Sequence, residues 1–147
     1  MKHLISYRDY ELSVRESVSD SFSPVHVMLR EDFNSTMTVL QNAISNKFIC
    51  TIYYKGERPG MIDDGYRYVE PYALGVNEKG NTVLRAWLLK GKSRRGRIDP
   101  KQVPGWRLFR VDRINSISTS LGTFTVPRKG YNAEDSGMSE VMYAAQF

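Results

Sequence analysis

Residues 104–114 place three arginines among aromatic and aliphatic side chains. Read with the period of two that a β-strand has, one face carries Trp106, Leu108, Arg110, Asp112 and Ile114. The other face then carries Arg107, Phe109, Val111 and Arg113. Neither face is purely apolar, so the segment is expected to be a strand at a boundary between core and solvent. Its arginines either line a charged groove that binds phosphates and stacks on bases, or are solvated along a twisted edge.

The length and composition predict one globular domain. A chain of 147 residues with 41% hydrophobic and 25% charged residues can bury a core but is short for two domains. Its apolar runs are too short for a membrane helix or a signal peptide, so a cytoplasmic location is expected. The single cysteine, Cys50, excludes an internal disulfide and is expected in the core.

Positive charge is concentrated in one segment. Residues 82–131 contain 12 Lys or Arg against two Asp, a net charge of +10, while the remaining residues carry −5. Within this segment, residues 90–97 form a basic loop with two glycines and no apolar anchor. Such a field attracts polyanions, although it does not identify the ligand. The alternative for the loop is a solvated, solubilising segment.

One helix is expected before the strands. Residues 1–34 contain short alternating stretches, such as Val25 and Val27, that suggest strands or extended arms, with a helix over Leu12–Val18 as an alternative. From Ser35 the apolar spacing becomes helical and continues to Phe48, with Ser35 and Thr36 as capping residues.

Five strands are expected after this helix. They are residues 48–54, 66–74, 82–90, 104–114, and either 116–120 or 123–126. Pro71 should lie at an edge or a bulge, because proline cannot donate to a ladder. Residues 132–147 are predicted to be either a terminal helix or a tail that docks on a partner subunit.

Several segments, in order, resemble the WYL domain of bacterial and phage proteins. They are Ala43-Ile44, Ile52-Tyr53-Tyr54, Arg67 to Leu74, Leu84-Arg85-Ala86 and Trp106 to Ile114. The resemblance covers residues 36–131, although the tripeptide that names the family is absent from the third strand. It implies a small five-stranded Sm-like, SH3-type β-barrel over 35–131, preceded by one short helix, with an N-terminal extension (1–34) and a C-terminal tail (132–147). The winged helix that usually precedes this barrel does not fit in the N-terminal extension.

The strand arginines and nearby aromatic residues are the predicted binding site. Small barrels bind single-stranded nucleic acid by stacking bases on aromatic rings and following the backbone with cations. The WYL resemblance likewise implies a negatively charged ligand held by strand arginines, in some members single-stranded DNA. We expect at least one of these arginines to form an ion pair with Asp112 or Glu70 instead. The predicted residues are Arg67, Arg85, Arg107, Arg110, Arg113, Tyr53, Tyr68, Trp87 and Trp106, with Arg94, Arg95 and Arg97 from the basic loop.

The sequence contains no recognisable catalytic constellation. Both histidines lie near the N-terminus, no cysteine–histidine zinc pattern occurs, and the hydrolase motif Gly-x-Ser-x-Gly is absent. We therefore expect a non-enzymatic module without cofactor or metal that binds single-stranded nucleic acid or a nucleotide, as a monomer or homodimer, in transcription regulation or phage-related control. The alternative is a protein-interaction factor, encoded by a phage or its host, that docks a basic surface on an acidic partner protein.

Overall fold

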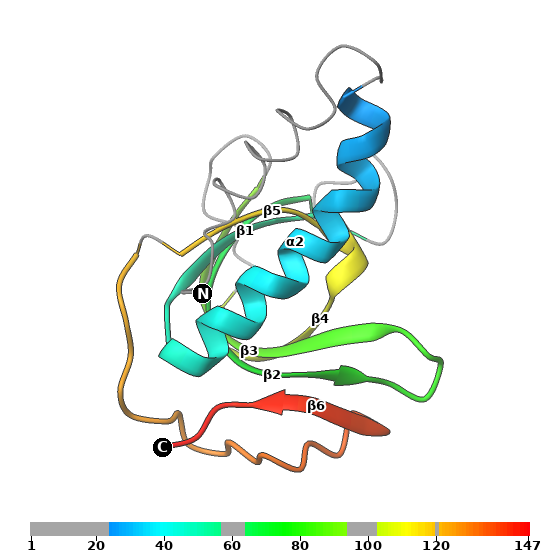
Figure 1. Cartoon of the computed structure of the whole chain (residues 1–147). Coiled ribbons are helices and arrows are strands. Elements are labelled where there is room, and N and C mark those ends of the chain that lie inside the picture. Colours follow the sequence, from blue (N-terminus) through cyan, green and yellow to red (C-terminus); the bar gives the residue numbers. More distant parts are fainter. Residues whose placement is uncertain (1–23, 57–63, 94–102, 120) are drawn as a thin grey trace.

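The computed structural model describes residues 24–56, 64–93, 103–119 and 121–147, which form one helix packed on a six-stranded antiparallel sheet. The helix, α2, spans Pro24–Asn46 and crosses one side of the sheet (Figure 1). A short 3-10 helix, η1 (Val111–Arg113), separates the fourth and fifth strands. The prediction of a mainly β, α+β fold with one helix before the strands is confirmed. The strands are β1 (Cys50–Tyr54), β2 (Gly65–Val76), β3 (Thr82–Ser93), β4 (Gly105–Arg110), β5 (Ile114–Ser118) and β6 (Glu140–Ala144).

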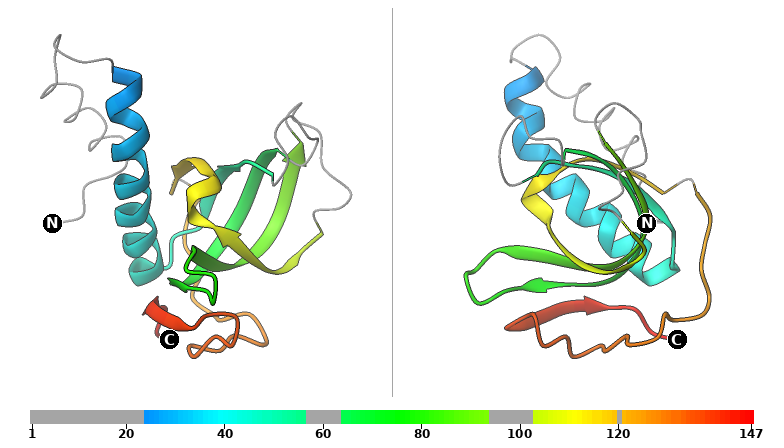
Figure 2. Two further views of the ribbon diagram at one scale, coloured as in Figure 1. Left: turned by 90° about the vertical axis from the view of Figure 1, so that its right-hand side faces the viewer. Right: turned by 180° about the vertical axis from the view of Figure 1, so that it is seen from behind.

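The first five strands pair in the order β4-β3-β2-β1-β5, and β6 pairs with β2. The sheet curves strongly around the core (Figure 2). Among the described residues, no ladder joins β4 to β5, so the sheet is not closed. It therefore differs in two details from the expected five-stranded barrel, since it stays open and gains a sixth strand.

Strand β2 is the centre of the sheet and is irregular at two points. Its register with β3 shifts between Tyr68 and Val69 and again between Pro71 and Ala73. The second shift is the bulge expected at Pro71, and it leaves Tyr72 without a partner on β3. The turn between β2 and β3 is closed by the Asn77 side chain, whose Oδ1 accepts hydrogen bonds from the backbone of Lys79 and Asn81.

The core lies between α2 and the concave side of the sheet, which we call the inner face. The buried positions alternate in β1 and in the first half of β2, as the period of two requires, whereas residues 69–75 of β2 are buried on both faces. Cys50 is fully buried here, as predicted, and burial raises the pKa of its thiol to about 12. Helix α2 contributes Val39, Leu40, Ala43 and Ile44, and the strands contribute Ile52, Val69, Leu74, Leu84, Leu88, Phe109, Ile114 and Ile117.

Helix α2 begins 11 residues earlier than predicted, at Pro24 instead of Ser35. Ser35 and Thr36 are therefore buried interior residues and not caps, and the strands or arms expected around Val25 are helical. Hydroxyl side chains can occupy a helix interior by bonding one turn back, as Thr38 does to the carbonyl of Asn34. The helix ends where Lys47 takes a φ of 57° and Phe48 N–H donates to Ala43 O.

The C-terminal segment, residues 132–147, contains a strand and not the predicted helix, whereas the alternative of a tail that docks on a partner subunit stays a prediction. Residues 140–144 form β6, which pairs with the second half of β2. The apolar spacing of Met138, Val141 and Ala145 allows a helix, but the second half of β2 has a free edge that β1 does not cover. Pairing with that edge satisfies the backbone groups of both strands.

The fourth strand is shorter than predicted, since β4 ends at Arg110 and η1 follows. The alternation of faces therefore stops before Asp112 and Arg113. The third strand continues to Ser93, and the fifth strand, left open between two ranges, is Ile114–Ser118.

A Gly75→Ala substitution tests the pairing of β6 with β2. A Cβ at Gly75 would lie 2.2 Å from Glu140 O and 2.5 Å from Met138 Sδ, so β6 must move away. We expect a loss of about 1–3 kcal/mol in the free energy of unfolding and faster amide exchange in residues 140–145.

Gly80→Ala is the matched control. Gly80 has a φ of 84° but no atom near the added Cβ, so this variant loses about 1 kcal/mol through backbone strain alone. Its β6 amides should exchange no faster, relative to the rest of the sheet, than those of the wild type. Equal exchange of β6 in Gly75→Ala and in this control would contradict the pairing.

Candidate nucleic-acid interface

The convex side of the sheet, which we call the outer face, carries most of the predicted aromatic site residues. On β2, Arg67 and Val69 are buried, whereas the alternate residues Tyr66 and Tyr68 face outward. The same alternation places Trp87 on the outer side of β3, opposite Trp106 of β4. Two groups of side chains result, one at each end of this face.

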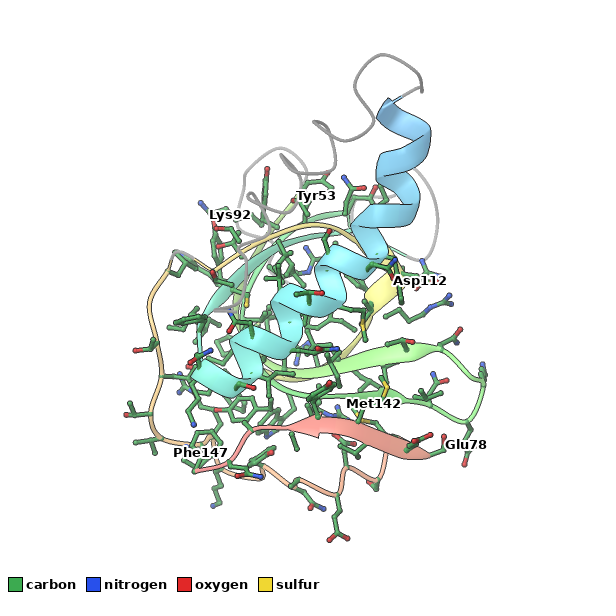
Figure 3. The ribbon with its side chains drawn as sticks, viewed as in Figure 1. Tyr53, Glu78, Lys92, Asp112, Met142 and Phe147 are labelled. Atoms are coloured by element: carbon green, nitrogen blue, oxygen red, sulfur yellow. The ribbon has the colours of Figure 1, made fainter. Side chains whose placement is uncertain are left out.

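The first group, the tyrosine–lysine cluster, consists of Tyr53, Tyr66, Tyr68, Lys90 and Lys92. Tyr53 and Tyr66 are register partners and meet edge to face, with ring centroids 4.9 Å apart. The ammonium groups of Lys90 and Lys92 lie 5.2 and 5.7 Å from the ring centroid of Tyr68. Figure 3 shows Tyr53 and Lys92 together at the end of the sheet remote from Met142 and Phe147.

This cluster is cationic and accessible. Tyr66 is 42% exposed, and Lys90 is also exposed. Within the part of the chain that the structure describes, neither lysine forms an ion pair with a carboxylate. Exposed rings beside uncompensated ammonium groups are suited to bases and phosphates respectively.

The second group, the tryptophan cluster, consists of Tyr72, Trp87, Trp106, Arg128 and Tyr131. Trp87 and Trp106 are perpendicular, with ring centroids 5.4 Å apart, and Trp106 is nearly parallel to Tyr131 at 6.3 Å. The Arg128 guanidinium lies 5.3 Å from the Trp87 ring centroid. Trp106 Nε1 donates to Lys129 O, which fixes the indole against the C-terminal segment.

A polar network around the buried Glu70 carboxylate and the buried Tyr72 supports the tryptophan cluster, and its third member, Arg128, is exposed. Arg128 donates two hydrogen bonds of 2.9 Å to the Glu70 carboxylate, and the Tyr72 hydroxyl donates to the same carboxylate at 3.2 Å. Burial and the Glu70 charge raise the pKa of Tyr72 to about 12, so this hydroxyl stays protonated. Glu70 thus neutralises the charge of Arg128. Arg128 therefore holds the aromatic rings in place and is not available to bind an anionic ligand.

An open pocket of about 290 Å³ lies beside Trp106 and Tyr131. Among the described residues of its lining, Arg85 is the cation, and Asp135 lies directly beside it. Arg85 Nε and Nη2 donate to the two oxygens of Asp135 at 2.6 and 3.0 Å. These hydrogen bonds hold the pKa of Asp135 below its usual range.

The predicted arginines do not converge on one surface. Arg67 is on the inner face, only 3% exposed, and donates to the carbonyls of Tyr66 and Lys92. Arg107 donates to the carbonyls of Trp106 and Val103. Arg113, predicted on a strand, lies in η1 and donates to Gly56 O at 2.8 Å, while its Nε is buried without a hydrogen-bond partner. Of the predicted arginines that the structure describes, Arg85 is the one that lines the pocket beside Trp106.

Arg110 is the arginine that forms the expected structural ion pair. Its guanidinium makes two hydrogen bonds with Asp112, at 3.0 and 2.6 Å, on the exposed surface near η1. Arg94, Arg95 and Arg97 lie outside the described residues.

Sequence reasoning missed Tyr66, Arg128, Tyr131 and Asp135. Tyr66 could have been found, because it shares the outer face with Tyr68 under the period of two. The other three contact the sheet from residues 128–135: Asp135 is 50 residues from Arg85 in sequence, Arg128 is 58 from Glu70, and Tyr131 is 25 from Trp106. No local pattern signals such contacts.

The described residues contain no group of three or more His, Cys, Asp or Glu that could hold a metal ion. The same part of the chain has no helix with the length and hydropathy of a membrane span. The site consists of aromatic rings and cations, which bind ligands by stacking and by charge.

Comparisons with known proteins establish no family. No family model matches the sequence, and no curated protein matches it significantly. Among solved structures, the chain is similar to Proteasome accessory factor B/C (PafBC) of Arthrobacter aurescens, with 28% identity over 67% of this chain and a TM-score of 0.46. The match spans 13% of PafBC, and a TM-score at this level does not establish a shared fold.

The Arg85–Asp135 pair should make stability depend on pH. Because the folded-state pKa of Asp135 is lowered, its contribution is present above the unfolded-state value of about 4 and is lost as the pH falls through the folded-state value. We expect Asp135→Asn to lower the free energy of unfolding by about 1 kcal/mol at pH 7, and less as the pH falls below about 4.

Urea unfolding of both proteins at several pH values measures this difference. Asp112→Asn is the control, because its carboxylate is exposed and its pair with Arg110 should contribute little at any pH. A wild-type advantage over Asp135→Asn that persists unchanged well below pH 3 would contradict the assignment.

Proposed function

We propose that this protein is a non-enzymatic module that binds single-stranded nucleic acid across the outer face of its sheet. The observation that carries the proposal is the tyrosine–lysine cluster, in which the exposed Tyr66 ring and the half-buried rings of Tyr53 and Tyr68, on β1 and β2, lie beside two lysines of β3. Bases stack on the rings whatever their identity, and the lysines follow the phosphate backbone.

The placement of these side chains on strands favours this function over a merely solvated surface. Tyr53, Tyr66 and Lys92 occupy registered positions on three adjacent strands, β1, β2 and β3. Their backbones are held by ladder hydrogen bonds, so the rings are positioned before a ligand arrives and little order is lost on binding. The tryptophan cluster continues the aromatic surface along β3 and β4.

Single strands fit this surface better than a duplex does. Duplex readers usually insert a helix with basic residues into the major groove. The described side chains of α2, residues 33–46, include no Lys or Arg, and its apolar side packs in the core. A curved sheet face with exposed rings suits unpaired bases, which can be turned outward and stacked.

The WYL resemblance supports a regulatory role for this binding. In that family the barrel senses a negatively charged ligand, and we extend this to the present chain as a cytoplasmic factor in transcription regulation or phage-related control. Docking on an acidic partner protein is the competing function. It uses the lysines but does not require the tyrosine rings to be accessible to bases.

Tyr66→Ala tests the stacking contribution. We expect about a tenfold weaker Kd for a labelled oligo(dT) with a 5′-hydroxyl, because one stacked base contributes about 1–3 kcal/mol. Fluorescence anisotropy measures the affinity. Tyr143→Ala is the matched control, since Tyr143 is 43% exposed, as Tyr66 is 42%, but lies on β6 at the other end of the sheet. Equal losses in both variants, or no binding by folded wild type, would refute the proposal.

Lys90→Ala tests the electrostatic contribution. We expect the slope of log K against log salt to become shallower by about 0.7, the value for one phosphate contact on a single strand. Lys79→Ala removes the same charge from the exposed turn between β2 and β3 and should leave the slope almost unchanged. If an acidic protein is the true partner, the slope of log K against log salt for the oligonucleotide will be the same in these two variants.

A further inference from the structure

The pocket beside the tryptophan cluster has an arrangement that packing alone does not require. Its lining combines two nearly parallel rings, Trp106 and Tyr131, with the Arg85 guanidinium. Arg85 comes from β3 and Asp135 from the C-terminal segment, so the pocket lies between two parts of the chain that are 50 residues apart. Aromatic rings beside one arginine are the groups that recognise a base with an attached phosphate.

Asp135 occupies the position where a phosphate would bind Arg85. Its two oxygens accept from Nε and Nη2, the forked arrangement that arginine also offers to a phosphate. The Arg85 side chain is partly accessible, with an exposure of 24%, whereas the Asp135 side chain is nearly buried at 8%. An anion can therefore reach the guanidinium from the pocket and compete with the carboxylate.

Gly137 allows Asp135 to approach Arg85 closely. A Cβ at this position would lie 2.7 Å from Arg85 Nη2 and 3.1 Å from Asp135 Oδ1. The backbone N–H of Gly137 also donates to Asp135 Oδ1 at 2.8 Å, which orients the carboxylate. A side chain at residue 137 would push the guanidinium away from Asp135 without removing either charge.

We propose that this pocket binds a nucleotide through its terminal phosphate, and that Asp135 is an internal competitor which the phosphate displaces from Arg85. The inference rests on the proposed function, because it assigns the end of the bound nucleic acid to this pocket and the rest of the nucleic acid to the tyrosine–lysine cluster. The base packs against Trp106 and Tyr131. A volume of about 290 Å³ is near the lower end for small-molecule pockets and suits one nucleotide.

The competition sets the specificity of the pocket. A neutral nucleoside gains only stacking, since Asp135 keeps Arg85 occupied, whereas a doubly charged phosphate monoester outcompetes a single carboxylate. Phosphodiesters within a strand carry less charge and are expected to bind Arg85 more weakly than a strand end does. The pocket therefore distinguishes terminal phosphates, on a free nucleotide or on a strand, from internal ones.

Tryptophan fluorescence tests the proposal, because both tryptophans of the chain belong to the tryptophan cluster. Thymidine monophosphate and thymidine are titrated into the wild type, Asp135→Asn, Gly137→Ala and Arg85→Gln. We expect the Kd for the monophosphate to fall about tenfold in Asp135→Asn and to fall also in Gly137→Ala, with thymidine unaffected. In Arg85→Gln the preference for the monophosphate over thymidine should disappear.

Matched oligo(dT) strands with a 5′-phosphate, a 3′-phosphate or neither separate the two sources of the phosphate. Tighter binding of a phosphorylated strand identifies the strand end as ligand, and a preference confined to the free monophosphate identifies a nucleotide. Either result supports the pocket assignment. A monophosphate affinity that is unchanged or weaker in folded Asp135→Asn and Gly137→Ala overturns it and leaves the pair as a structural tether.

Failure of this inference is distinguishable from failure of the proposed function. The strand without a terminal phosphate cannot displace Asp135 from Arg85, so it reports on binding across the outer face without the phosphate site of the pocket. If it binds the wild type and Tyr66→Ala weakens it, while the monophosphate shows no dependence on Asp135, only the pocket assignment is wrong. If that strand does not bind at all, the proposed function is wrong, whatever the pocket does.

Discussion

Pro71 cannot donate a backbone hydrogen bond, and the architecture of the outer face depends on how β2 accommodates it. The bulge at this proline leaves Tyr72 unpaired with β3, and the Tyr72 ring becomes the hub of an aromatic group with Trp106, Phe124, Tyr131 and Phe147. Its hydroxyl accepts from Arg128 N–H and donates to Glu70, while its carbonyl accepts from Ala145 N–H. One irregular residue therefore attaches the C-terminal segment to the sheet, and this attachment forms the walls of the pocket.

The two ends of the outer face follow from this arrangement and suit different ligand chemistry. Around Tyr68, β2 pairs with β1 and β3, and among the described residues Tyr66 and Lys90 are exposed on the outer side. Around Tyr72, the C-terminal segment covers the face, and carboxylates from Glu70 and Asp135 neutralise Arg128 and Arg85. In the proposed function the open end accepts a chain of phosphates, and in the further inference the covered end exchanges one carboxylate for an anion.

The sequence predicted which side chains share a face within regular strands. It did not predict the 3-10 helix, the terminal strand or the contacts between distant segments. Tyr53, Tyr68, Trp87 and Trp106 lie on one face because the period of two holds within their strands. The predicted arginines do not share this face, because Arg67 alternates to the inner face and the 3-10 helix after Arg110 redirects Arg113. The stripe from Met138 to Ala145 was compatible with a helix, and only the free edge of β2 decides for a strand. The partners of Arg85 and Glu70 are 50 and 58 residues away in sequence, beyond any local pattern.

Photocrosslinking tests the central claim, that single-stranded nucleic acid lies across the outer face, most directly. A 4-thiothymidine oligonucleotide is irradiated with the protein, and the modified residues are identified by mass spectrometry. The account predicts adducts at Tyr53, Tyr66 or Tyr68, suppressed by excess unlabelled strand and by increased salt. Specific adducts confined to the exposed side chains of α2 or β6, such as Phe33 or Tyr143, would contradict it.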